Sequence, residues 1–155
     1  MSAPNPSIAA TRPVNPPGAS PVLTIDQLWK GLVIKAREPH RFLEIFESCE
    51  VVKEEGTLIS RRAKTRTGQI IAEDVHLYEP TICYFESGTF RVTNIVSYDS
   101  AGELQLTFSF ANGIPGPNPE EALTNPVVAA NKVGDAAVNH TLEAVRGLVR
   151  SGEIQ

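Results

Sequence analysis

Hydrophobic and polar residues alternate along most of Glu50 to Phe110, which is typical of β-strands that bury one face. Five short breaks divide this stretch into six strands, at 54–56, 66–68, 78–80, 87–88 and 100–102. The first, second and fifth breaks are three-residue loops that end in glycine. The last residue of such a hairpin loop takes a left-handed backbone conformation, which glycine adopts without penalty. We therefore predict one continuous antiparallel meander.

The loop lengths also predict which residues lie opposite each other, and opposed residues point to the same face of a sheet. The predicted pairs are Cys49 with Arg61, Val51 with Ile59, Ile59 with Val75, Arg61 with Glu73, Ala63 with Ile71, Glu73 with Phe85, Val75 with Cys83, Thr81 with Asn94, Cys83 with Val92, Phe85 with Phe90, Val92 with Phe110, Asn94 with Phe108, Val96 with Leu106 and Tyr98 with Leu104. All five hairpins give one largely apolar inner face. A slip of one residue in any hairpin would turn part of this set outward, so their agreement supports the alignment.

Helical spacing of apolar residues begins shortly before the meander. Thr24 is a predicted N-cap, and Gln27 three residues later completes a capping box. Apolar residues then recur at helical intervals from Ile25 to Ala36. Pro39 ends this helix because proline cannot continue it.

The remaining elements complete the predicted architecture. Residues 7–15 form a short edge strand, 40–46 a short second helix, and 126–150 one long helix; residues 1–6 are a flexible tail, and 7–155 a single domain. The order predicts an α+β fold in which a curved antiparallel sheet of about seven strands wraps around the C-terminal helix, with two short helices after the first strand.

Three polar residues interrupt the predicted inner face. Arg61 and Glu73 lie opposite each other and would form an ion pair, because neither charge is easily buried alone. Asn94 would need a partner such as Thr81 or a ligand. In one interpretation these groups orient a ligand and Glu73 is a general base. The pKa of Glu73 would then be set by its burial and by the charge of Arg61. In the other, they form a structural salt bridge and a satisfied core amide.

Small residues along one stripe of the long helix leave room for a ligand beneath it. A curved sheet facing such a stripe favours a cavity, although close packing of the helix on the sheet would use small residues equally well. The predicted cavity residues are Val51, Ile59, Val75, Cys83, Phe85, Phe90, Val92, Phe108, Phe110, Ala130, Gly134, Ala137 and Thr141. The loop 113–119 lies where a cavity entrance is expected.

Composition excludes several other classes of function. The 155 residues carry a formal net charge of −4 without a Lys/Arg cluster, which argues against nucleic-acid binding. No apolar run is long enough to insert into a membrane, and no signal-peptide pattern opens the chain, so the expected location is cytoplasmic. Cys49 and Cys83 are expected to be buried thiols, with a disulfide as the alternative. No metal-ligand spacing and no phosphate-binding glycine loop is present, so we expect neither a metal nor a cofactor.

The chain resembles the START-like superfamily of polyketide cyclases, lipid-transfer proteins and birch-pollen-type allergens, and more narrowly the AtaL-like family of specialised-metabolite clusters. The resemblance covers nearly the whole chain and is carried by Pro13-Val14-Asn15-Pro16, Leu23-Thr24 with Leu28-Trp29, Lys35-Ala36-Arg37-Glu38-Pro39 with Phe42, Ser48-Cys49-Glu50-Val51, Thr93-Asn94-Ile95, and Thr141 through Arg146. It implies a helix-grip fold with a hydrophobic cavity and leaves the reaction type open.

Two functions from different classes follow. One is a cofactor-independent cyclase, isomerase or dehydratase acting on a polyketide- or peptide-derived intermediate, with Glu73, Arg61 and Asn94 moving a proton or holding an oxyanion. The other is a non-catalytic carrier of such a hydrophobic molecule, since one fold hosts both roles. The protein is expected to be a monomer or homodimer. A third possibility is that residues on the outer face of the sheet form a dimer and that partner binding is the function.

Overall fold

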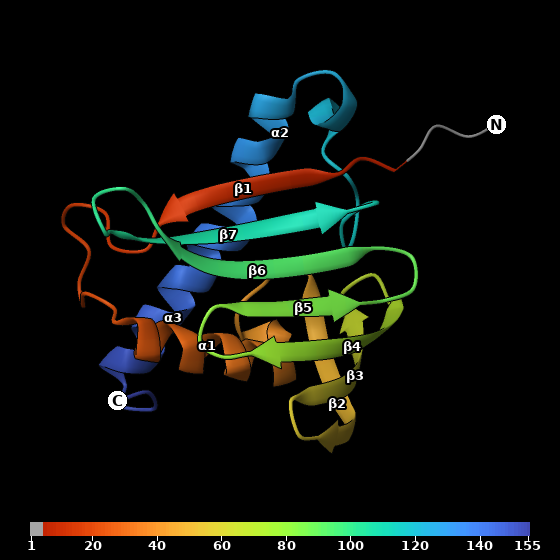
Figure 1. Ribbon diagram of the computed structural model, residues 1–155. Helices are drawn as coiled ribbons and strands as arrows, with labels where there is room; N and C mark the ends of the chain where they lie inside the picture. The colour runs from red at the N-terminus through yellow and green to blue at the C-terminus, as the bar shows by residue number, and fades with distance from the viewer. Residues whose placement is uncertain (1–4) are drawn as a thin grey trace.

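The computed structural model describes residues 5–155, and in them seven strands form one antiparallel sheet (Figure 1). The strands are β1 (Ile8–Pro13), β2 (Phe46–Glu55), β3 (Leu58–Thr65), β4 (Ile70–Tyr78), β5 (Ile82–Glu86), β6 (Arg91–Tyr98) and β7 (Leu104–Ala111). Their order across the sheet is β1-β7-β6-β5-β4-β3-β2. Most of the predicted tail lies outside the described residues; Pro6 is buried, and its carbonyl accepts a hydrogen bond from the N–H of Gly113.

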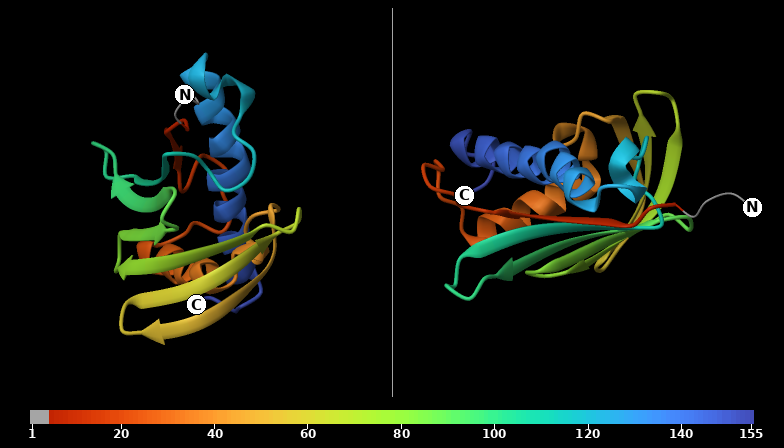
Figure 2. Two further views of the ribbon diagram at one scale, coloured as in Figure 1. Left: turned by 90° about the vertical axis from the view of Figure 1, so that its right-hand side faces the viewer. Right: turned by 90° about the horizontal axis from the view of Figure 1, so that it is seen from above.

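The helices lie on one side of this curved sheet (Figure 2). They are α1 (Ile25–Arg37), the short η1 (Pro39–Arg41) and η2 (Glu120–Leu123), and the continuous run of α2 (Pro126–Val133), η3 (Gly134–Asn139) and α3 (His140–Arg150). The predicted α+β helix-grip fold is therefore confirmed. The extent of the second short helix was wrong, because η1 is only a three-residue turn and Phe46 already begins β2.

The capping box of α1 forms as predicted. The Thr24 side chain accepts the Gln27 N–H, and the Gln27 side chain accepts the Thr24 N–H. Further along, α1 lies directly against α3 at Gly31, where an added Cβ would come within 2.5 Å of the Val145 side chain. This close approach of the two helices requires glycine.

The long C-terminal helix contains one π-helical turn, η3. Its buried positions advance by four residues from Ala129 to Val133, by five to Val138, and by four again to Leu142. The step of five reflects the extra residue of a π-turn, which rotates the following helix relative to a regular α-helix. A regular α-helical spacing therefore could not give the correct buried face on both sides of η3.

The predicted register is confirmed in two hairpins and wrong by two residues in the other three. The β3–β4 and β6–β7 pairs are as predicted, including Arg61 with Glu73 and Asn94 with Phe108. The corrected pairs are Val51 with Arg61, Cys49 with Ala63, Val75 with Phe85, Leu77 with Cys83, Phe85 with Val92 and Cys83 with Asn94. An irregularity in β2, and a displacement of the β4–β5 and β5–β6 turns by one residue toward the C-terminus, cause these shifts.

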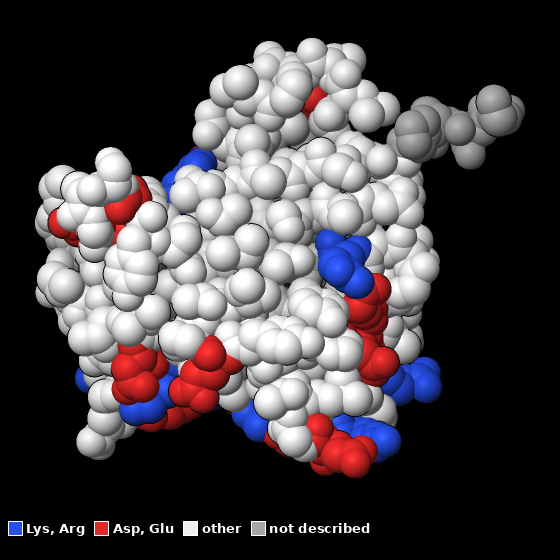
Figure 3. Space-filling model, viewed as in Figure 1, with Lys and Arg blue, Asp and Glu red and all other residues white. Residues whose placement is uncertain are grey.

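A shift of two residues preserves the face to which a side chain points, since side chains alternate along a strand. The predicted inner face is consequently correct, and all of its residues are buried or half-buried. Its outer counterpart carries few charges across the middle of the sheet (Figure 3). There, His76 stacks on Tyr84 with ring centroids 4.5 Å apart. No helix of residues 5–155 combines the length and the apolar character needed to cross a membrane.

Candidate functional site

An ion pair between β3 and β4 lies inside the molecule. The Arg61 Nη2 and Nε atoms donate to Glu73 Oε1 at 2.7 and 3.2 Å, and the two side chains are only 4% and 1% exposed. Burying two charges is unfavourable unless each is paired and hydrogen-bonded. The predicted opposition of these residues is thus realised as a short, dry contact.

Arg61 also holds the end of α1. Its Nη1 donates to the carbonyl oxygens of Lys35 and Ala36 at 3.2 and 3.0 Å, and its guanidinium carbon lies 4.7 Å from the ring centroid of Phe85. The last carbonyls of a helix lack partners within the helix and attract a cation. Arg61 therefore joins β3, β4 and α1 into one unit, which leaves it little free hydrogen-bonding capacity.

Lys35 is the third charged residue of this site, and the sequence analysis did not identify it. Its Nζ donates to Asn94 Oδ1 at 3.1 Å and lies 4.7 and 4.9 Å from the ring centroids of Phe108 and Phe85. Burial lowers the pKa of Lys35 to about 8, and the Arg61 charge acts in the same direction, while Cys83 and Glu73 oppose it. Lys35 thus carries an amine that exchanges a proton near neutral pH.

A sequence signal for Lys35 does exist. It comes seven residues after Leu28 and three after Leu32, so it falls on the apolar face of α1. A lysine at such a position must either extend to solvent or be buried with partners. In the structure it is 4% exposed.

Asn94 lies beneath Lys35 and is fully buried. Its Oδ1 accepts from Lys35 rather than from the predicted partner Thr81, because Cys83 is the residue opposite Asn94. Its Nδ2 has no protein hydrogen-bond partner, and neither does the buried hydroxyl of Thr141. Burial also raises the pKa of the Cys83 thiol to about 11, so this thiol stays protonated. We refer to Lys35, Arg61, Glu73 and Asn94 together as the inner cluster.

A small chamber of about 30 Å³ adjoins the inner cluster. The three charged side chains of the inner cluster, Lys35, Arg61 and Glu73, line the chamber together with aromatic and aliphatic residues. The lining consists of Lys35, Leu43, Phe46, Arg61, Glu73, Phe85, Val92, Phe108, Phe110 and Pro115. One water needs roughly 10–15 Å³ on the same scale, so the chamber accommodates one functional group rather than a ring.

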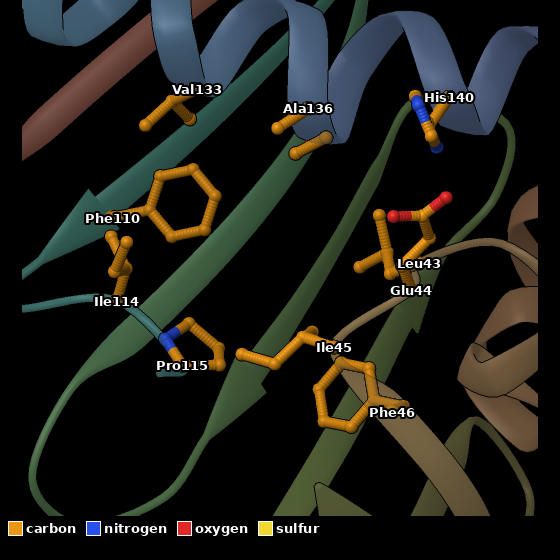
Figure 4. Close-up of a pocket in the computed structure, with 11 residues that line it drawn as sticks. Leu43, Glu44, Ile45, Phe46, Phe110, Ile114, Pro115, Val133, Ala136 and His140 are labelled. Atoms are coloured by element: carbon orange, nitrogen blue, oxygen red, sulfur yellow. The ribbon is translucent and has the colours of Figure 1, made fainter. Parts of the chain in front are cut away.

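A larger pocket of about 250 Å³ lies beside the chamber (Figure 4). Its lining consists of Leu43, Glu44, Ile45, Phe46, Phe110, Ile114, Pro115, Val133, Ala136, Ala137 and His140, and four of these residues also line the chamber. The exposed Glu44 and His140 point toward each other at its edge (Figure 4). Because a cavity of roughly 150 Å³ holds benzene, this pocket has room for a molecule with about two rings. We call it the outer pocket.

The structure distributes the predicted cavity residues over several places. Phe85, Val92, Phe108 and Phe110 line the chamber, and Phe110 and Ala137 line the outer pocket. The others pack in the interior or elsewhere: Val51, Ile59, Val75, Cys83, Phe90 and Thr141 belong to the packed interior without lining either space, and Ala130 lines a separate surface hollow beside β1.

Gly134 has a different role from the predicted one. A Cβ there would come within 2.5 Å of the Arg12 guanidinium, so this glycine accommodates Arg12 and not a ligand.

Of the outer pocket's lining, only Phe110, Ala137 and the entrance loop that contributes Ile114 and Pro115 were predicted from the sequence. Leu43 to Phe46 were assigned to a helix, whereas Leu43 to Ile45 form a turn and Phe46 begins β2. The π-turn brings Ala136, Ala137 and His140 to the pocket, and the prediction of one regular helix over 126–150 did not include it. In residues 5–155 no group of His, Cys, Asp and Glu side chains is arranged to hold a metal ion.

Comparison with known proteins gives one matching family and several solved structures with a similar fold. The model of a family described as acetylaranotin biosynthesis cluster protein L matches residues 8–152. No curated protein sequence matches the chain significantly. Among solved structures, TTHA0849 from Thermus thermophilus is similar with 15% identity and a TM-score of 0.57, covering 95% of this chain and 99% of that chain.

Two aromatase/cyclases are also similar in structure. Zhui aromatase/cyclase from Streptomyces sp. R1128 has 16% identity and a TM-score of 0.50, with 91% of each chain covered. The di-domain ARO/CYC StfQ from the steffimycin biosynthetic pathway has 12% identity and a TM-score of 0.56, covering 95% of this chain and 52% of that chain. At these identities the likeness shows a shared fold.

Proposed function

The chain belongs to the AtaL family of biosynthesis cluster proteins, and on that premise we propose that it binds a hydrophobic small molecule of specialised metabolism and transforms it without a cofactor. The reaction would be a cyclisation, isomerisation or dehydration of a polyketide- or peptide-derived intermediate. The fold shared with aromatase/cyclases supports this class of substrate. A single domain formed by residues 7–155 would carry the whole activity.

The observation that carries the proposal is the position of the inner cluster relative to the outer pocket. An apolar pocket beside buried, convergent polar groups is the usual form of a small-molecule site. Leu43, Phe46, Phe110 and Pro115 line both spaces, so a ligand bound in the outer pocket lies next to the charged groups.

The chemistry assigned to the site is proton transfer. The pKa of Lys35, lowered to about 8 by burial, is suited to a group that both accepts and donates a proton near neutral pH. Its neutral amine would remove a proton from a carbon next to a carbonyl, and its ammonium would protonate a departing oxygen. Glu73, which Arg61 holds on Oε1, would help to stabilise the charged form of Lys35 and is a second candidate base.

A non-catalytic carrier is the second candidate. It is favoured by the extensive hydrogen bonding of Arg61, whose role at the end of α1 is structural. In a carrier the inner cluster would orient the ligand without changing it. With either function, the protein would act as a monomer or a homodimer. A dimer would use the outer face of the sheet, which carries few charges (Figure 3).

The experiment that separates these functions starts with native mass spectrometry of protein purified from its own host. A co-purified molecule identifies the ligand, and wild type, Glu73→Gln and Lys35→Met are then compared for product formation and affinity. An enzyme loses turnover in at least one variant while ligand affinity stays within about threefold. Absence of turnover by the wild type on intermediates of its own cluster contradicts the enzyme and leaves the carrier.

A further inference from the structure

The charges of the inner cluster do not balance. Two cations, Lys35 and Arg61, face one carboxylate, Glu73, and all three side chains are at most 4% exposed. Because a buried net charge is unfavourable, such a site either loses a proton or binds a counter-ion. The lowered pKa of Lys35 reflects the first route. A ligand that brings a negative charge would supply the second.

The unused hydrogen-bond donors of the cluster are on Lys35. Arg61 directs four of its N–H groups to Glu73 Oε1 and to the carbonyls of Lys35 and Ala36. Lys35, in contrast, has three N–H donors and a single hydrogen-bond acceptor, Asn94 Oδ1. The Nδ2 of Asn94 is also unpaired. An oxygen entering the chamber would therefore find its strongest free donor at Lys35.

The volumes set the shape of the ligand. The chamber of about 30 Å³ admits a small polar group, and the neighbouring pocket of about 250 Å³ admits an apolar body. A molecule that fills both must carry its oxygen at one end. Glu44 at the pocket edge would disfavour a second negative charge at the opposite end.

We propose that the ligand is an acidic hydrophobic molecule, with one carboxylate, enolate or phenolate oxygen that enters the chamber and pairs with the Lys35 ammonium while its rings occupy the outer pocket. This inference rests on the proposed function and specifies the chemical class of its ligand.

The test compares acids with their uncharged amides by isothermal titration calorimetry. The probes are 2-naphthoate, 2-naphthylacetate and 3-(2-naphthyl)propionate, each with the matching carboxamide, so that the distance from ring to oxygen varies. We expect at least one acid to bind about tenfold more tightly than its amide to the wild type near pH 7. The preference disappears in Lys35→Met and persists in Lys53→Met, which removes an exposed charge.

The wild type provides a second measurement that does not depend on the variant's folding. The charged and titratable groups around Lys35 are Arg61 on β3, Glu73 on β4 and Cys83 on β5. Cys83, with its pKa raised to about 11, stays neutral to above pH 9. The acid-over-amide preference should accordingly fall about fivefold or more between about pH 7 and 9.5, as Lys35 loses its proton.

The outcomes distinguish the two proposals. Equal binding of acid and amide to the wild type overturns the acidic ligand and leaves hydrophobic binding intact. An acid preference that survives in Lys35→Met, or that stays unchanged in the wild type between about pH 7 and 9.5, also overturns it. Failure of every probe to bind at millimolar concentration contradicts both the inference and the proposed hydrophobic site.

Discussion

The inner cluster and the outer pocket occupy neighbouring space and are built in opposite ways. The cluster consists of buried charged and polar side chains from α1, β3, β4 and β6, and each of the four is hydrogen-bonded to another member of the cluster. The outer pocket consists of apolar side chains and two exposed polar residues at its edge, Glu44 and His140. The difference indicates a division of roles, in which the outer pocket provides apolar contact area and the inner cluster provides charge at a fixed position.

The largest effect should come from breaking the ion pair of the inner cluster. Glu73→Ala leaves Arg61 buried without its carboxylate, which should cost about 3–5 kcal/mol of unfolding free energy. Lys64→Ala on the same strand as Arg61 breaks the exposed contact with Glu47 and should cost less than about 1 kcal/mol. Urea denaturation measures both. Similar losses in the two variants would show that the buried pair contributes no more than a surface pair.

The pH dependence of stability should reveal the burial of Lys35. Its folded pKa of about 8 lies below its ordinary value of 10.5, so the unfolded chain binds more protons between these pH values and stability rises with pH in that window. The rise should reach roughly 3 kcal/mol relative to Lys35→Met, in which this contribution is absent. Denaturation of both proteins at about pH 7 and 10.5 gives the difference. A parallel pH dependence in wild type and variant would contradict the burial of a charged Lys35.

Filling the outer pocket should remove ligand binding without affecting the cluster. Ala136→Phe places a ring in the pocket from the exposed side of η3 and should weaken the affinity for the naphthyl probes about tenfold or more. Ala101→Phe in the exposed β6–β7 turn is the matched control. Calorimetry measures affinity, and denaturation shows whether stability is unchanged. Undiminished affinity in Ala136→Phe would place the ligand elsewhere.

The smallest effect should come from the pocket edge. His140→Ala removes an exposed ring and should change probe affinity less than about threefold, since exposed polar groups contribute little to binding energy. The same calorimetric titration tests this. A loss comparable to that of Lys35→Met would move the polar anchor of the ligand from the inner cluster to the edge.

The inner face of the sheet could be predicted because alternation is robust to errors of two residues. The loops at Gly68 and Gly102 gave the correct pairs, and the β4–β5 and β5–β6 turns did not, yet Cys83 and Phe85 point inward in either alignment. Arg61 and Glu73 could be predicted as a pair because the β3–β4 hairpin was aligned correctly.

The rest of the site depends on contacts that strand alternation does not encode. Lys35 becomes part of it because the end of α1 lies over the sheet, where Arg61 and Asn94 contact it, and these are contacts between distant segments. Ala136 and His140 reach the pocket through a π-turn, which the assumption of a regular α-helix leaves out. The predicted stripe of small residues assumed a regular helix and therefore included Gly134. In the structure Gly134 faces the Arg12 guanidinium and lines neither the chamber nor the outer pocket.

The bonds from Arg61 to the carbonyls of Lys35 and Ala36 tie the architecture of the fold to the recognition of a ligand. Evolution can reshape the outer pocket at Ala136 with little penalty to folding, because that side chain is exposed and lies outside the hydrophobic core. Replacing Arg61 would instead remove the hydrogen bonds that hold the C-terminal end of α1, and with that end the position of Lys35. Among relatives with this arrangement, substrates should consequently diversify through changes in the outer pocket, whereas the residues of the inner cluster should change only together.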